Sequence, residues 1–401
     1  MKKLRRLFLA TAALGALTAC GGGGGGVSAA PAPAPAPTAP AAPAPAPTPA
    51  PSSLSVAYKD LFRVGAAVTP AQVAAADRVA LMQREFNVLV AENVMKPSQI
   101  GKADGVYDFS DADKIVNFAK ANGMKVRGHT LVWHQQQADW MFKNGSGPGG
   151  APTAAELTTR LQKYIADVIG HFKSIAPGVV YAWDVVNEAF VPDEAGVPQV
   201  GGWRKSNLYD ILGPQFIDIA FAAAAKADPD ALLFYNDYGT ESPAKRALIL
   251  TLIDSLKAKG IAIHGVGHQA HYAMNYPADW TGLEQSIVAV SAKTNSAGQA
   301  LTNHITELDI ALNPGIMDNT ITSVTPALLD AQALRYKGIY QMFLNNRSKV
   351  SAVLTWGIDD DTSWLRTWPV TRLEAPLLFD GKLGAKPAYV AVEKLGREFA
   401  R

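Results

Sequence analysis

Short apolar segments alternate with longer helical ones along most of this chain, and few folds are compatible with that alternation. Eight runs rich in β-branched or apolar residues predict strands, at residues 62–68, 88–92, 125–133, 179–187, 232–237, 261–269, 303–309 and 351–357. Stretches with helical periodicity lie between and after them, at residues 71–85, 115–120, 153–172, 214–227, 243–259, 282–293, 326–345 and 388–399. Eight strands that are each followed by a helix predict an α/β fold, the (β/α)8 TIM barrel.

Helix start signals support two of these helices. Thr153 and Glu156 have the spacing of a capping box, and Ser110 to Asp113 offer a similar cap before residues 115–120. An open, doubly wound sheet is the alternative to the barrel. No glycine-rich phosphate-binding motif follows any predicted strand, which argues against the nucleotide-binding versions of either fold.

The first 20 residues have the pattern of an export signal. A basic stretch at residues 1–6 precedes an apolar run at residues 7–17, which is too short to span a bilayer because about 20 residues are needed. The run ends in Leu17-Thr-Ala-Cys20 and resembles the lipobox of bacterial lipoproteins. This resemblance implies a signal peptide at residues 1–19, lipidation of Cys20, and a lipid-anchored protein at the outer membrane or cell surface. The alternative is an ordinary secretory signal in which Cys20 is incidental.

Residues 20–53 predict a linker. Six glycines follow Cys20, and ten of the 26 prolines fall between positions 31 and 51 in alternation with alanine. Such a segment cannot bury apolar surface and favours an extended polyproline II form. We therefore expect a disordered linker at residues 20–53 and one catalytic domain at residues 54–401.

Composition excludes several classes of protein for the rest of the chain. Hydrophobic residues make up 48% of the sequence, which excludes disorder as its main state. Four of the 37 basic residues lie within the first six positions, so the remainder holds 33 basic against 35 acidic residues. This near-neutral body lacks the basic footprint of a nucleic-acid-binding protein. The single cysteine excludes a disulfide scaffold.

Polar and aromatic side chains gather where the predicted strands end, which is where barrel enzymes form their active sites. In chain order they are Glu92, Asn93, Lys96, His129, Trp133, His134, Gln136, Asn187, Glu188, Gln269, His271, Glu307, Asp309, Trp356 and Trp364. Glu188 and Glu307 end apolar strands that should be buried on both faces. A carboxylate in that position is costly unless it is partnered or used in chemistry, so we predict that both are catalytic.

Two carboxylates across a barrel mouth, among tryptophans, suit glycoside hydrolysis. One carboxyl group donates a proton to the leaving oxygen while the other attacks or stabilises the anomeric carbon. Tryptophan faces stack on the C–H faces of sugar rings, and amide, lysine and histidine groups bond their hydroxyls. The sequence thus predicts a glycosidase that needs no cofactor.

These motifs resemble glycoside hydrolase family 10, the retaining endo-β-1,4-xylanases, over essentially the whole predicted domain. Four segments carry the resemblance: Glu92-Asn93-Val-Met-Lys96-Pro97, Gly128-His129-Thr-Leu-Val-Trp133-His134, Trp183-Asp-Val-Val-Asn187-Glu188-Ala189 and Thr306-Glu307-Leu-Asp309. The resemblance implies that xylan and xylo-oligosaccharides are the substrates. It also implies a covalent intermediate, with the two catalytic carboxyl groups about 5–5.5 Å apart.

The resemblance also assigns roles. Glu188 would be the general acid/base, Glu307 the nucleophile, and Asn187 a partner of the sugar 2-hydroxyl at the −1 subsite, the ring that is attacked. His271 and Asp309 would hold and orient Glu307. The other implied substrate-binding residues are Glu92, Asn93, Lys96, His129, Trp133, Gln136, Gln269, Trp356 and Trp364. Gly239 stands where the family often has Asn, and residues 145–150 lengthen a loop near the mouth; both concern subsite preference.

Three other interpretations deserve comparison. His264, His268 and His271 suggest a zinc site, but in a strand residues four apart lie about 13 Å apart, too far to share one ion, so we expect no metal. A non-catalytic lipoprotein that captures xylo-oligosaccharides would not need both glutamates. A related β-glycanase acting on cellulose or mixed-linkage glucan stays open. We expect a monomer whose partners are xylan and, through lipid, a membrane.

Overall fold

The computed structural model describes residues 52–192 and 194–399. The predicted signal peptide, Cys20 and all of the predicted linker before Ser52 lie outside these described residues. The first helix, α1, spans Leu54–Ala57 and is capped by the Ser53 side chain. Over the described ranges, no helix combines the length and apolar character that a membrane crossing requires.

Eight parallel strands close into a barrel, so the predicted (β/α)8 fold is confirmed and the open sheet is wrong. In barrel order they are β1 (Arg63–Val68), β2 (Val88–Ala91), β5 (Lys125–Gly128), β7 (Val180–Asn187), β10 (Leu232–Asp237), β11 (Gly265–His268), β13 (Thr302–Ala311) and β14 (Val350–Thr355). Pairing of β1 with β14 closes the ring. Two short strands extend it at its rim: β6 (Val132–Trp133) beside β7, and β12 (His271–Ala273) beside β13.

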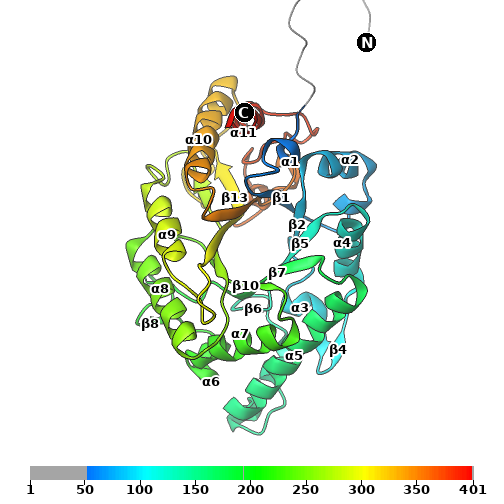
Figure 1. Ribbon diagram of the computed structural model, residues 1–401, viewed down its shortest axis with the longest axis vertical. Coiled ribbons are helices and arrows are strands. Elements are labelled where there is room, and N and C mark those ends of the chain that lie inside the picture. The colour runs from blue at the N-terminus through cyan, green and yellow to red at the C-terminus, as the bar shows by residue number, and fades with distance from the viewer. Residues whose placement is uncertain (1–51, 193, 400–401) are drawn as a thin grey trace, which may run out of the picture. The chain divides into compact units, whose positions relative to one another are not determined.

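Helices surround this ring of strands (Figure 1). The long ones are α2 (Ala76–Glu85), α4 (Ser110–Ala121), α5 (Ala154–Ile175), α7 (Gln215–Ala227), α8 (Pro243–Ala258), α9 (Thr281–Ser291), α10 (Pro326–Asn345) and α11 (Pro387–Phe399). Short helices α3 (Pro97–Ile100) and α6 (Asn207–Leu212) lie in connecting segments, as do the hairpins β3–β4 (Gly101–Ala103, Val106–Tyr107) and β8–β9 (Gln199–Val200, Trp203–Arg204). The sequence patterns did not predict these short pieces.

The helix start signals had different outcomes. The Thr153 hydroxyl accepts from the Glu156 amide and the Glu156 carboxylate accepts from the Thr153 amide, which confirms the capping box of α5. The predicted Ser110 cap is wrong. Ser110 is already the first helical residue of α4, and the Asp108 carboxylate accepts from both its amide and its hydroxyl. The Ser110 hydroxyl is therefore a donor to Asp108 and not the acceptor that an N-cap requires.

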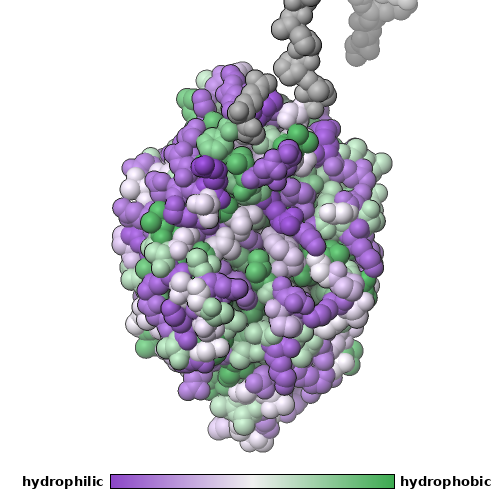
Figure 2. All heavy atoms as spheres, in the orientation of Figure 1, coloured by the Kyte–Doolittle hydropathy of each residue, from purple (hydrophilic) through white to green (hydrophobic). Residues whose placement is uncertain are grey.

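The barrel interior is tightly packed and partly polar. Trp183 is one of the largest fully buried side chains, and a Cβ atom at Gly128 would lie 2.2 Å from its ring. Only glycine therefore fits at the end of β5. Arg127 is buried in the same strand and forms an ion pair with Asp184 of β7. The core thus brings fixed charges close to the strand ends. On the face shown in Figure 2, hydrophobic residues are scattered among hydrophilic ones.

Candidate active site

The residues predicted from strand ends meet in one cleft of about 690 Å³ at the carboxyl ends of the barrel strands. Fourteen of them line it: Glu92, Asn93, Lys96, His129, Trp133, His134, Gln136, Asn187, Glu188, Gln269, His271, Glu307, Trp356 and Trp364. Asp309 lies behind this wall in contact with His271. Parallel strands in a closed barrel end at the same rim, which is why residues more than 200 positions apart converge.

Glu188 is the first residue after β7, and its carboxylate accepts three hydrogen bonds. Trp133 Nε1 lies 2.8 Å from Oε2, while Gln269 Nε2 at 2.9 Å and Asn187 Nδ2 at 3.3 Å bond Oε1. Its backbone has a φ of 58°, in the left-handed region. That conformation is disfavoured for a residue with a Cβ atom and is found at functional sites. The turn aims the carboxyl group into the cleft, where its side chain is 12% exposed.

Glu307 lies within β13 at a break in strand register between Ile305 and Leu308. Such irregularities re-aim side chains beside active sites. The carboxylate is buried and accepts from Asn236 Nδ2 at 2.9 Å and from His271 Nε2 at 3.1 Å. Burial raises the pKa of Glu307, but the His271 hydrogen bond, the neighbouring imidazoles and the Asn236 amide outweigh it and hold that pKa below its ordinary value. Glu307 is therefore an ionised carboxylate near neutral pH.

His271 is a cation that links Glu307 to Asp309. Its register partner in β13 is Asp309, and its Nδ1 lies 3.0 Å from the Asp309 carboxylate. Burial lowers the pKa of His271, yet the charges and hydrogen bonds of Asp309 and Glu307 overcome this and raise the pKa to about 10. With both ring nitrogens protonated, the imidazolium donates to both carboxylates. Trp364 Nε1 donates to Asp309 at 2.9 Å, which fixes this tryptophan in the cleft wall.

Amide side chains connect the two glutamates. Asn187 and Asn236 are register partners in β7 and β10, and Asn236 Nδ2 donates to Asn187 Oδ1 at 2.9 Å. Gln269 Nε2 approaches the same oxygen at 3.2 Å. Thus Asn236 bonds Glu307 while Gln269 bonds Glu188, and Asn187 joins both amides. The carboxyl groups are held in one rigid arrangement by donors that keep their oxygens occupied.

Glu92, Asn93 and Lys96 form a polar group on the loop after β2. Lys96 Nζ donates to Asn93 Oδ1 at 2.8 Å and lies 4.8 Å from the Trp133 ring centre. Burial lowers the pKa of Lys96, although the charges of Glu307, Glu92 and Glu188 oppose the change. Burial likewise raises the pKa of Glu92, against the charge of Lys96 and the Asn93 hydrogen bond. These groups can bond sugar hydroxyls on one side of the carboxylate pair.

Aromatic side chains and His129 enclose the site. His129 bonds the buried Asp184 at 3.0 Å and meets Trp356 edge to face at a ring distance of 5.4 Å. Trp364 lies 5.1 Å from His271 and stacks on Trp368 at 5.4 Å. The structure thus places His129, Trp356 and Trp364 around the carboxylates, as their strand-end positions predict.

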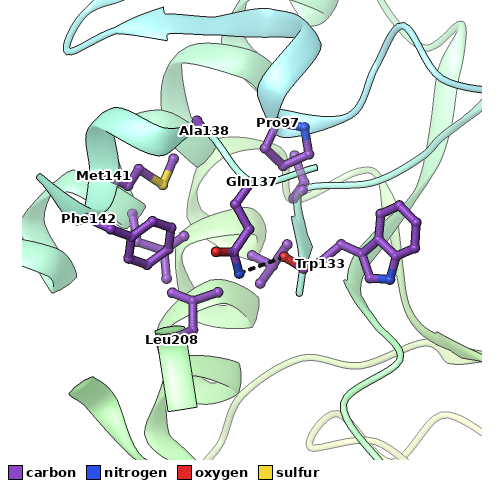
Figure 3. Close-up of a pocket in the computed structure, with 10 residues that line it drawn as sticks. Pro97, Trp133, Gln137, Ala138, Met141, Phe142 and Leu208 are labelled. Carbon is purple, nitrogen blue, oxygen red and sulfur yellow. Dashed lines mark hydrogen bonds between the residues drawn. The ribbon is translucent and has the colours of Figure 1, made fainter. Parts of the chain in front are cut away.

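The backbone of Trp133 is anchored beside a second, smaller pocket. Figure 3 shows an apolar pocket among Pro97, Met141, Phe142 and Leu208, into which the Trp133 indole does not point. The Gln137 amide donates to the Trp133 carbonyl at 3.1 Å (Figure 3). The backbone of Trp133 is therefore fixed on the pocket side while its indole stays free to reach Glu188.

Sequence reasoning missed several residues in and behind the cleft. Asn236 bonds Glu307 and lies one residue before the end of β10, so its position near a strand end was a usable signal. Arg204, Tyr238 and Glu194 line the cleft itself. Of these, Glu194 and Arg204 come from the segment between β7 and α6, where no periodic pattern pointed to the site. His134 was noted but given no role; burial and the charge of Arg204 lower its pKa to about 3.

The other two histidines of the zinc hypothesis, His264 and His268, each make separate hydrogen bonds. His264 accepts from the Leu233 amide at 3.0 Å, and the buried His268 bonds Thr240 and Asn303. Within the described residues, no group of three His, Cys, Asp or Glu side chains could hold a metal ion. Residues 145–150 contact the start of α5 through Ser146 and Glu156, and none of them lines the cleft.

Comparison with known proteins places this geometry in a family. The model of "Glycosyl hydrolase family 10" matches residues 53–395. "Endo-1,4-beta-xylanase A" of Caldicellulosiruptor sp. (strain Rt8B.4) is 41% identical over 342 residues, which cover 84% of this chain and 46% of that protein. "Beta-1,4-xylanase" of Dictyoglomus thermophilum is 40% identical over 346 residues, covering 85% of this chain and 90% of that protein.

A solved structure agrees. Xylanase B from Clostridium stercorarium F9 superimposes with a TM-score of 0.76 at 37% sequence identity, covering 85% of this chain and 99% of that one. The chain thus spans about half the length of the first relative but nearly the whole of the other two. Because the family model covers most of the sequence and the cleft carries its paired carboxylates, the chain belongs to glycosyl hydrolase family 10.

Proposed function

We propose that this chain is a retaining endo-β-1,4-xylanase that cuts internal bonds of xylan. The observation that carries the proposal is the pair Glu188 and Glu307, which face one cleft and are joined through the Asn187 and Asn236 amides. The two relatives and the solved structure named above are xylanases by name, which supports xylan as the substrate.

In the first step, Glu307 attacks the anomeric carbon of the bound sugar. The bond from that carbon to the leaving oxygen breaks, and Glu188 gives its proton to that oxygen. In the second step, Glu188 takes a proton from water, whose oxygen attacks the same carbon and releases Glu307. Two inversions give net retention of configuration, and both carboxyl groups end in their starting states.

The surroundings of each glutamate suit its role. Glu307 must be ionised to attack, and the His271 cation and Asn236 amide favour the ionised form. Glu188 accepts from neutral donors only, namely the Trp133 indole and two amides. The acid step requires a proton on Glu188, and none of these three hydrogen-bond donors carries a positive charge.

The substrate-binding residues extend the same proposal. Glu92, Asn93, Lys96, His129, Gln136 and Gln269 would bond sugar hydroxyls, and Trp133, Trp356 and Trp364 would enclose sugar rings. Xylose lacks the C5 hydroxymethyl group of glucose, so crowding by Trp356 and Trp364 would disfavour glucan. A related β-glycanase activity is the alternative outcome of the test below.

The test is reducing-sugar release from xylan, cellulose and mixed-linkage glucan, with Glu307→Gln as the matched control. Rapid hydrolysis of xylan alone, lost in the variant, is the expected result. Proton NMR of the first product released from a xylo-oligosaccharide should show the β-anomer before mutarotation. Release of the α-anomer would contradict the retaining mechanism, and hydrolysis of glucan alone would contradict the proposal that xylan is the substrate.

We further propose that residues 1–19 are a signal peptide and that lipid on Cys20 anchors a monomeric enzyme to the outer membrane or cell surface. The basic start, the short apolar run and the position of the only cysteine support this proposal. Cys20→Ala should move the protein from the membrane fraction to the soluble fraction without changing its turnover of xylan. A variant that stays in the membrane fraction would contradict the lipid anchor.

A further inference from the structure

Arg204, in the segment that follows β7, holds the backbone of Glu188. It ends β9, and its side chain is only 10% exposed. Its Nε donates to the backbone carbonyl of Glu188 at 3.0 Å, and its own amide donates to the carbonyl of Ala189 at 2.8 Å. Two consecutive carbonyl groups at the turn after β7 are therefore bound by one arginine.

This turn needs such support. The left-handed φ of 58° at Glu188 is disfavoured for a residue with a Cβ atom, and it persists where surrounding contacts hold it. The two amides of the turn are held from the barrel: Glu188 N donates to the Asn236 carbonyl at 2.9 Å, and Ala189 N donates to the Tyr235 hydroxyl at 3.0 Å. Arg204 supplies the matching donors on the carbonyl side.

The guanidinium group of Arg204 is itself held in place by Tyr238 and Glu194. Its Nη2 donates to the Tyr238 hydroxyl at 2.7 Å, and that hydroxyl donates to the Glu194 carboxylate at 2.6 Å. Glu194 also lies 3.9 Å from Arg204 and 3.6 Å from Lys245, whose ammonium group covers the Tyr238 ring at 3.8 Å. A planar guanidinium held at both edges has little freedom to move.

We propose that Arg204 is a positioning residue for the general acid: it fixes the turn that aims the Glu188 carboxyl group at the leaving oxygen. This inference rests on the retaining mechanism proposed above and deepens it. Arg204 contacts Glu188 through its backbone only, so its removal changes where the carboxyl group lies without removing a donor from the carboxylate itself.

A misplaced acid has a distinct kinetic signature. A phenol with a low pKa leaves as the phenolate and needs no proton, whereas a weakly acidic phenol or a sugar leaves only if a proton reaches its oxygen as the bond breaks. A misplaced Glu188 carboxyl group should therefore slow the first step for poor leaving groups and leave the rate for good leaving groups nearly unchanged. A purely structural or substrate-binding role would lower the rates for all leaving groups by the same factor.

The experiment measures kcat/KM of the full chain on aryl β-xylobiosides whose phenols range from dinitrophenol to unsubstituted phenol. Arg204→Met should lose about 10- to 100-fold on the phenyl substrate and little on the dinitrophenyl substrate. Arg204→Lys, which keeps the charge but not the fork, should fall between Arg204→Met and the wild type. Glu188→Ala gives the steepest dependence that loss of the acid can produce.

Arg160→Met is the matched control. Arg160 also binds backbone carbonyl groups, those of Trp140, Met141 and Lys143, but none near Glu188. It should show the wild-type dependence on leaving group. Equal losses on all substrates in Arg204→Met, or no loss, would overturn the proposal.

Two further outcomes are decisive. If Arg204→Met does not fold, as judged by circular dichroism, Arg204→Lys and Tyr238→Phe decide, because Tyr238→Phe frees the outer edge of the guanidinium and should give a milder loss with the same dependence on leaving group. If Glu188→Ala shows no dependence, the acid role of Glu188 fails and the role of Arg204 fails with it. A different result overturns only the positioning role of Arg204: in that case the kcat/KM of Glu188→Ala depends on the leaving group, but the kcat/KM of Arg204→Met equals that of the wild type.

Discussion

Replacing Asp309 with asparagine tests the charge state of the site most directly. Asp309 is buried, and its carboxylate accepts from His271 and from Trp364. Its charge is the main reason that the pKa of the buried His271 rises from 6.5 to about 10. Asparagine keeps the shape and one acceptor but removes the charge, so the pKa of His271 should fall and the imidazole should be neutral over more of the pH range.

The size of the effect follows from linkage. A histidine whose pKa is higher in the folded than in the unfolded state adds stability that is complete below the unfolded pKa of about 6.5 and is lost as the pH rises toward 10. Each pH unit in that window removes about 1.4 kcal/mol through one proton. Between pH 7 and 9 the wild type should lose about 2–3 kcal/mol of unfolding free energy through His271.

The assay is urea unfolding of the wild type and Asp309→Asn at pH 6, 7.5 and 9. The variant should be less stable than the wild type at pH 6, and the difference should shrink by about 2–3 kcal/mol by pH 9. Because groups that do not contact His271 titrate equally in both proteins, the difference isolates His271 and its carboxylate partners Asp309 and Glu307. Asp230→Asn, at a carboxylate that is 92% exposed, is the control and should show a constant difference. A constant difference for Asp309→Asn would show that Asp309 does not set the charge of His271.

Three other substitutions have clear expected outcomes. Glu188→Ala should lower turnover of xylan by about 10²- to 10⁴-fold while calorimetry shows unchanged xylo-oligosaccharide binding; unchanged turnover would reject its role as the acid. Asn236→Ala removes a donor to the Glu307 carboxylate, a hydrogen bond worth about 1.5–3 kcal/mol. The value of kcat/KM should therefore drop about 10- to 150-fold, and the acid limb of its pH profile should move to higher pH. A wild-type pH profile would argue against the contact. Glu85→Ala leaves the Tyr389 hydroxyl and the Leu54 amide unpaired between α1, α2 and α11, so thermal unfolding should occur several degrees lower with xylan turnover intact at 25 °C. An unchanged midpoint would show that Glu85 does not stabilise this junction.

Local sequence patterns were sufficient for the barrel and for most of the cleft. Apolar runs and helical periods depend on neighbouring residues, and parallel strands that close a ring end at one rim, so Glu188 and Glu307 could be brought together from strand ends alone. Details that depend on single contacts were harder. The Ser110 cap was wrong because α4 already begins at Ser110, whose amide and hydroxyl both donate to Asp108. The predicted strand at 261–269 is shorter in the structure, where it spans Gly265–His268.

The fold, the paired carboxylates and the aromatic residues around them can be inferred from local sequence, because they follow from periodicity and from the geometry common to all parallel barrels. The contacts that hold the two glutamates arise only when the chain is folded. The amide bridge through Asn236, the positive charge of His271 and the grip of Arg204 on the Glu188 turn join residues that are 16 to 71 positions apart. Hydrogen bonds act over about 3 Å, and distances of that size are set by how the strands register and how the loops fold back, which no local pattern encodes.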